Sequence, residues 1–189
     1  ELGSPLVALE TLLKHDAQAM ILSKSQVHFY FIERDKSNSD KLRDELKNRV
    51  LPSNVIVDPP LNADCFTVLA KVIADAKTLN KKLPPSFIFC DPYGFSVPGR
   101  VLRELMEFPQ VELFINIIWR ELDMSMEQVR NSNMSQAPIL DALFDGQDWK
   151  AGISASDPDS RAEQCAALFQ KMTGARWATT VTMLDSGRI

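Results

Sequence analysis

Apolar residues recur along the chain with two periods that alternate. Short runs rich in Val, Ile and Phe have the length and composition of buried strands. The expected strands cover residues 26–33, 54–58, 86–90 and 111–119. Elsewhere apolar positions recur every three or four residues, which is typical of amphipathic helices. The expected helices cover residues 37–50, 63–79, 96–106 and 157–174, and another begins at Ser4, a capping residue, followed by Pro5.

The remaining segments are less regular. Residues 124–138 are polar and rich in Asn and Ser, which predicts a short helix followed by a loop. Residues 177–184 predict a fifth strand, and residues 185–187, Asp-Ser-Gly, have the composition of a hairpin turn.

Strands that alternate with helices of about ten or more residues favour a parallel sheet with right-handed crossovers. The nearly continuous apolar character of residues 87–90 and 113–118 predicts a sheet that is buried on both faces. We therefore expect an α/β fold, Rossmann-like, with a mostly parallel sheet and helices on both faces. It would form a single domain over residues 1–189.

Composition narrows the function classes. With 45% apolar and 24% charged residues, the chain has the balance of a globular protein. The net charge of −4 gives no overall attraction to nucleic acid, so nucleic acid is a partner that the charge does not favour. A local basic face remains open at Lys81, Lys82, Arg100 and Arg103.

The cysteine and histidine content excludes several chemistries. Three widely spaced cysteines, Cys65, Cys90 and Cys165, fit neither a disulfide framework nor a zinc site. The two histidines do not assemble a triad or a metal site. No apolar run reaches the ~20 residues of a membrane span, and the start lacks a signal-peptide pattern. These features predict a cytoplasmic protein with no membrane partner.

Ligands of open parallel sheets bind beyond the carboxyl ends of the strands, so polar residues there are candidates. Glu33 closes the first strand and could accept hydrogen bonds from ribose hydroxyls, or could simply begin a solvated loop. Asp64 and Phe66 follow the second strand and would face the same cleft. Asp64 could accept from an adenine amino group or cap the following helix.

The third strand runs into Asp91-Pro92-Tyr93. Pro92 fixes its own φ, so the Asp91 carboxylate and the Pro92 carbonyl would lie side by side as acceptors, with the Tyr93 ring beside them. Two acceptors next to an aromatic ring suit an exocyclic amine. The alternative is a strand that stops, with Tyr93 and Phe95 packed under a loop.

Further candidates follow the fourth strand. Trp119 and Arg120 could contact substrate together with Phe95, and Arg120 could instead pair with Asp123 on a solvated turn. Asn116 lies inside an apolar run, where an unpaired amide would be costly, so we expect it to find partners in a structural role.

Five segments together resemble a known family, the three-Cys-motif partner proteins of bacteria. They are GSPLVALE (3–10), HFYFIERD (28–35), FIFCDPYGF (87–95), INIIW (115–119) and WATTVTML (177–184). The fold of that family is similar to that of class I S-adenosylmethionine-dependent methyltransferases. The resemblance implies that Glu33 would bind the ribose of the methyl donor and that Asp64 would lie near its adenine. It also implies that residues 91–93 correspond to the D/N-P-P-Y-like loop of amino-group methyltransferases, and that a three-cysteine-motif protein could be a partner.

The chain departs from this pattern in three places. The loop has one Pro rather than two, no glycine-rich first strand precedes Ser4, and no return strand follows Ile189. We therefore expect residues 1–189 to be part of a longer protein. Two functions stay open: a methyltransferase of unknown acceptor, such as an amino group of a nucleic acid or of a small planar molecule, and a non-catalytic assembly partner that keeps the fold. Other nucleotide-binding classes are disfavoured because no G-x-G-x-x-G and no G-x-x-x-x-G-K occurs.

Overall fold

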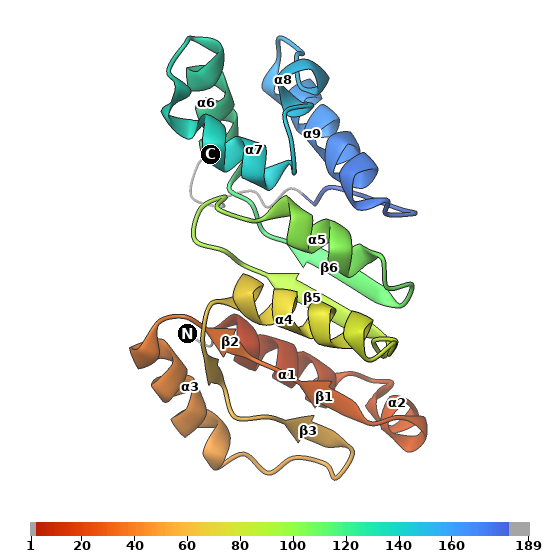
Figure 1. The fold of residues 1–189 in the computed structure, drawn as a ribbon. Helices are drawn as coiled ribbons and strands as arrows, with labels where there is room; N and C mark the ends of the chain where they lie inside the picture. Colours follow the sequence, from red (N-terminus) through yellow and green to blue (C-terminus); the bar gives the residue numbers. More distant parts are fainter. Residues whose placement is uncertain (1–2, 182–189) are drawn as a thin grey trace. The chain divides into compact units, whose positions relative to one another are not determined.

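The computed structural model describes residues 3–181. The chain divides into two compact units, Glu1–Val68 and Leu69–Ile189, which are treated separately below. Both contain parallel strand pairs and helices (Figure 1). The predicted α/β class with parallel pairing is therefore confirmed.

The first unit begins with helices and continues as two strand pairs joined by a helix. Its elements are α1 (Ser4–Lys14), α2 (Gln18–Lys24), β1 (Val27–Phe29), β2 (Ile32–Glu33), α3 (Lys36–Lys47), β3 (Val55–Val57), β4 (Leu61–Asn62) and the start of α4 (Cys65–Thr78). Ser4 is the first helical residue rather than the cap, because Gly3 occupies the N-cap position without a side-chain hydrogen bond. The helix α2 was not predicted.

The strand predicted at residues 26–33 is interrupted in its middle, and the second strand resumes as an unpredicted element, β4. Val27 pairs with Val55 and Ile32 pairs with Leu61, so one extra residue lies in the second strand between the two pairings. This second strand carries Pro59-Pro60, and proline has no N–H to donate to a ladder. The parallel ladder is therefore broken there, and it resumes where the Leu61 amide donates to the Phe31 carbonyl at 2.9 Å.

The core of the first unit packs helices α1 and α2 against strand β3. Leu9 from α1, Leu22 from α2 and Val55 from β3 are buried together. Helix α3 buries Ser39 completely, and its hydroxyl has no hydrogen-bond partner within residues 3–181. A buried hydroxyl without a partner is a destabilising feature.

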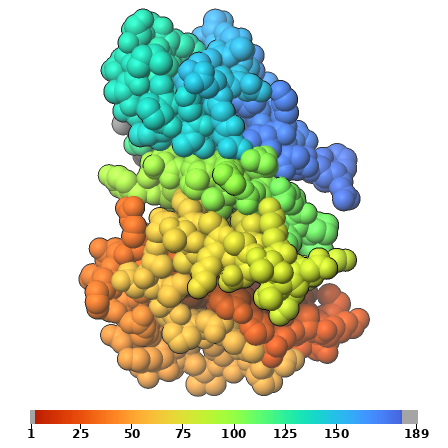
Figure 2. Space-filling view, viewed as in Figure 1, coloured from red at the N-terminus to blue at the C-terminus, as the bar shows by residue number. Residues whose placement is uncertain are grey.

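The second unit contains a parallel β-α-β arrangement, in which β5 (Ser86–Cys90), α5 (Gly99–Met106) and β6 (Val111–Ile115) follow one another. One face of the strand pair is covered, because Ile73 of α4 and Leu105 of α5 are buried together with Val111. The prediction that both faces are buried is wrong for β5, because Phe87 and Phe89 on its other face are exposed. The outward side of α4 lies at the surface (Figure 2). Helices α4 and α5 have amphipathic patterns because each packs only one side against the strands.

The rest of the second unit is helical within the described residues. Its elements are α6 (Trp119–Arg130), the short 3-10 helix η1 (Met134–Gln136), α7 (Ala137–Leu143), α8 (Trp149–Gly152) and α9 (Pro158–Thr173). Asp157 caps α9 by accepting from the Ser160 amide at 2.8 Å, and Gly174 ends it at φ 66°, so the helix expected over residues 157–174 is confirmed. The Arg161 guanidinium donates two hydrogen bonds to Asp123, at 2.6 and 2.7 Å, and ties α9 to α6.

Three boundary predictions are wrong. The strand expected over residues 111–119 ends at Ile115, because β5 ends just before Pro92 and leaves the later residues without a strand to pair with. Within residues 124–138 the expected short helix is confirmed as the second half of α6, but most of the expected loop is η1 and the start of α7. Residues 177–181 form no strand and are exposed, since nothing in the described chain pairs with them. Residues 182–189, with the expected hairpin turn, lie outside the described part.

Within residues 3–181, no helix combines the length and the apolar character that a membrane crossing requires.

Candidate functional site

The parallel register of the second unit brings two polar side chains together beyond its strand ends. Phe89 pairs with Phe114 and Cys90 with Ile115, so Asp91 and Asn116 come next in the same register. The ladder extends that far, because the backbone N–H of Asn116 donates to the Cys90 carbonyl at 2.8 Å. The side-chain Nδ2 of Asn116 then donates to Oδ1 of Asp91, also at 2.8 Å.

This contact explains the side-chain amide that the sequence places inside an apolar run. We predicted that Asn116 would find a partner, and the structure confirms it. The partner is the Asp91 carboxylate, the leading catalytic candidate, so Asn116 belongs to the site rather than only to the scaffold. The sequence signal was a polar amide inside an apolar run, and the register of β5 and β6 then showed which residue it meets.

The loop after Asp91 presents an aromatic ring to solvent. Tyr93 is 97% exposed, which argues against the alternative in which it packs under the loop. Gly94 adopts φ 73°, a left-handed conformation that glycine adopts without a steric penalty. Further along, Val97 is buried and anchors the loop before α5 begins.

The other residues that were predicted to contact the substrate differ in their exposure to solvent. Phe95 and Trp119 are half-buried, and Arg120 is exposed on the first turn of α6. The suggested pairing of Arg120 with Asp123 is wrong, since Asp123 is bound by Arg161. The Arg161 guanidinium holds the Asp123 carboxylate with two hydrogen bonds, a geometry that is stronger than a single bond between charged groups.

In the first unit, Glu33 lies at the carboxyl end of β2 and is half-buried. Its Oε1 accepts from the Asp35 amide at 2.7 Å, so the side chain turns back over the loop that starts α3. Asn62, on β4, donates from Nδ2 to the carbonyls of Glu33 and Arg34 at 3.0 and 2.8 Å. These bonds hold the two strand ends together beside the carboxylate. The Asn62 clamp is a feature that the sequence reasoning missed.

Asp64 caps helix α4. Its Oδ1 accepts from the Thr67 amide at 2.8 Å and from the Thr67 hydroxyl at 2.9 Å. The hydrogen bond from the Thr67 backbone, followed by that from its hydroxyl, lowers the pKa of the Asp64 carboxyl below its usual range. The capping alternative is thus confirmed, while a contact with adenine stays a prediction.

The neighbours of Asp64 on α4 do not present reactive groups. Phe66 is buried, so its ring packs in the interior, and its predicted contact with a cofactor stays untested. Burial raises the pKa of the Cys65 thiol, which keeps it protonated near neutral pH. Burial likewise raises the pKa of Cys165, on α9, to about 12. Neither thiol is activated as a nucleophile.

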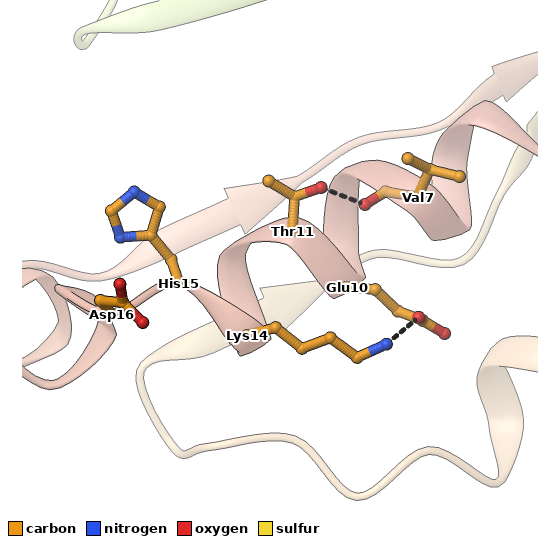
Figure 3. A pocket seen from close by; sticks show the side chains of 6 residues that line it. All are labelled: Val7, Glu10, Thr11, Lys14, His15 and Asp16. Carbon is orange, nitrogen blue, oxygen red and sulfur yellow. Dashed lines mark hydrogen bonds and ion pairs between the residues drawn. The ribbon is translucent and has the colours of Figure 1, made fainter.

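A shallow hollow of about 490 Å³ lies along α1 and the turn that follows it (Figure 3). Two of its charged side chains already pair with each other, because Lys14 bonds to Glu10 at 2.7 Å, and Arg49 bonds to the same carboxylate at 3.2 Å. No predicted site residue lines this hollow, and its one helix face offers few free polar groups. We therefore do not regard it as the site.

The two arginines of the predicted basic face are neutralised, whereas Lys81 and Lys82 form no ion pair within the described residues. Arg100 pairs with Glu104, and Arg103 pairs with Asp145, each at 2.7 Å. In the described part of the chain, no group of three or more His, Cys, Asp or Glu side chains is placed to hold a metal ion.

The geometry defines an α/β protein with polar side chains gathered at the carboxyl ends of two parallel strand pairs, one in each unit. In comparisons with protein-family models, with curated proteins and with solved structures, nothing matches the chain.

Proposed function

We propose that this protein is an S-adenosylmethionine-dependent methyltransferase with a Rossmann-like fold that transfers a methyl group to an amine. The observation that carries the proposal is the Asp91 carboxylate, which Asn116 holds at 2.8 Å beyond the carboxyl ends of β5 and β6, two residues before the exposed Tyr93. Open parallel sheets bind their ligands at this edge, beyond the carboxyl ends of the strands. The resemblance of five segments to the three-Cys-motif partner proteins points to the same class.

The residues at the end of β2 fit the nucleoside part of the methyl donor. Glu33 is a half-buried carboxylate, and beyond the bond from Asp35 its Oε2 receives no hydrogen bond from residues 3–181. Such an oxygen can accept a hydrogen bond from a ribose hydroxyl. Asn62 fixes the backbone around Glu33, so the carboxylate is positioned before a ligand arrives. When bound, the donor supplies an electrophilic methyl group on its sulfonium.

Asp91 would orient the acceptor. Its carboxylate accepts an N–H of the amine and thereby directs the lone pair of the nitrogen, while the Tyr93 ring offers a face for a planar substrate. Catalysis of this kind arises mainly from orientation and from removal of water, because the methyl donor is intrinsically reactive. The proposal includes a reducing cytoplasmic location, for which three widely spaced cysteines are typical.

Calorimetric titration of S-adenosylmethionine into the protein and into its Glu33→Ala variant tests the donor site. We expect micromolar binding that weakens at least about tenfold in the variant. Glu45→Ala is the matched control, because Glu45 is an exposed glutamate on α3 without a role in the site. Unchanged binding in Glu33→Ala, or no binding by the protein, would overturn the donor assignment.

A measurement of methyl transfer from S-adenosylmethionine to an amine tests the acceptor site. The Asp91→Ala variant should bind the donor nearly as well as the wild type but should lose transfer. An Asp91→Ala variant with full activity would remove Asp91 from the mechanism.

A second candidate function is that of a non-catalytic partner of a three-cysteine-motif protein. The observation in its favour is the apolar surface on β5, where Phe87 is 68% and Phe89 is 47% exposed. Exposed apolar patches often mark contacts with other proteins. Co-purification of such a partner, together with no binding of S-adenosylmethionine, would favour this function over the enzyme.

A further inference from the structure

The Asp91 carboxylate determines which end of the Asn116 side-chain amide faces it. A carboxylate only accepts hydrogen bonds, so the NH₂ group of Asn116, and not its carbonyl, must face Oδ1 of Asp91. This leaves one N–H on Nδ2 and the second carboxylate oxygen, Oδ2 of Asp91. Neither has a hydrogen-bond partner among the described residues. The pair therefore presents an acceptor directly beside a donor.

An aromatic surface adjoins this pair on the same side of the strands. Side chains alternate along a strand, so Phe89 and Asp91 share one face of β5, and Phe114 and Asn116 share that face of β6. The rings of Phe89 and Phe114 are stacked, with centroids 5.4 Å apart and an angle of 14° between their planes. A planar ligand that reached the polar pair would meet aromatic carbon next to it.

We propose that Asn116 is a second recognition residue and that the methyl acceptor is a heteroaromatic ring whose exocyclic amine lies next to a ring nitrogen. The amine N–H bonds to Oδ2 of Asp91, and the ring nitrogen accepts from Nδ2 of Asn116. Adenine and cytosine have such an edge. This inference rests on the proposed function, because the methyl transfer requires an amine.

The charge of the surface favours a small ligand over a nucleic acid strand. Glu112 is exposed on β6 in register with Phe87, and so it lies on the same face as Asp91. Two carboxylates on this face oppose a phosphate backbone, which binds where Lys and Arg gather. We therefore assign the site to a free base or a small molecule that contains one.

The test uses ligand-observed NMR titration without S-adenosylmethionine. The probes are 9-methyladenine, 9-methylpurine and 9-methylhypoxanthine, which lack the ribose that Glu33 would hold. The first has the amine beside the ring nitrogen, the second lacks the amine, and the third has a carbonyl in its place. We expect 9-methyladenine to bind about tenfold more tightly than the other two, since its amine bonds to a charged acceptor.

Two variants link the preference to the site. Asn116→Ala should weaken 9-methyladenine binding about tenfold, because the donor to the ring nitrogen is lost and Asp91 is no longer held. Gln128→Ala removes an exposed amide from α6 and should leave binding unchanged. A thermal melt of each variant verifies that it is folded.

Each result decides the inference separately from the proposed function. Equal binding of the three probes, or no binding at all, would overturn the acceptor class even where the donor titration succeeds. A preference for 9-methyladenine that survives in Asn116→Ala would show that the ring binds elsewhere, and would also overturn it. A preference lost in Asn116→Ala supports it, whether or not Glu33 binds the donor.

Discussion

Gly99 is a position where the chain that leaves the loop of the candidate site packs closely against helix α7. It is the first residue of α5 and follows directly on the loop that starts at Asp91. A Cβ built on Gly99 would lie 2.2 Å from the Leu143 carbonyl oxygen and 2.9 Å from its carbon. It would also lie 3.0 Å from Sδ of Met172. The methionine can turn away, but the buried backbone of α7 cannot.

The Gly99→Ala substitution should therefore destabilise the protein. Overpacking of a well-packed interior costs about 1–3 kcal/mol, and this contact is at the severe end. Alanine has the better helix propensity, which returns up to about 1 kcal/mol, less at a first helical residue. The expected net loss in the free energy of unfolding is about 2 kcal/mol, which corresponds to a Tm lower by roughly 4–8 °C for a chain of this length.

Thermal melting followed by circular dichroism measures this shift, with Gly152→Ala as the control. Gly152 lies in helix α8, and a Cβ there would meet only the Leu168 methyl groups at 3.9 Å, an ordinary van der Waals distance. The control should melt within about 2 °C of the wild type or above it. Equal melting temperatures for Gly99→Ala and the wild type would refute the close approach of α5 and α7.

Two further predictions concern the first unit and the start of α4. Ser39→Ala should raise the free energy of unfolding by about 1 kcal/mol, because it removes a buried hydroxyl without a described partner. Denaturant titration measures it, with the exposed Ser37→Ala as control, and a loss of stability would mean that the hydroxyl has a partner after all. Asp64→Ala should cost about 1 kcal/mol at neutral pH through the lost cap. Because the folded pKa of Asp64 is lowered, its contribution is present above the unfolded pKa, near 3.8, and disappears as the pH falls through the folded pKa. Melts of wild type and variant should therefore converge in acid, and a difference that stays constant down to pH 2 would contradict this assignment, whereas Asp75→Ala should change little at any pH.

Much of the local structure could be predicted from the sequence. The period of apolar residues predicted α3, α4, α5 and α9, and the composition of the short runs predicted β1, β3 and β5. These are local signals, since the covering of one helix face or the burial of a strand is recorded in the spacing of side chains along that segment. The cap by Asp157 and the left-handed Gly174 also depend only on neighbouring residues.

The errors arose where pairing with a distant segment decides the conformation. Residues 177–181 have a strand-like composition, but a strand forms only when another edge offers its N–H and C=O groups. Ile117 and Ile118 continue an apolar run, yet the partner strand ends before Pro92, so the chain leaves the ladder and enters α6.

For the candidate site, the sequence by itself determined which polar residues follow the strands, because Glu33, Asp64 and Asp91 stand at the changes of pattern. It left open what each side chain does, since capping and ligand binding use the same chemical groups. The structure showed that Asp64 caps α4 through its local bonds to Thr67, and the tertiary structure decided that Asn116 holds Asp91. Register is the physical reason: twenty-five residues separate Asp91 from Asn116 along the chain, and only the parallel pairing of β5 with β6 brings them within a hydrogen bond.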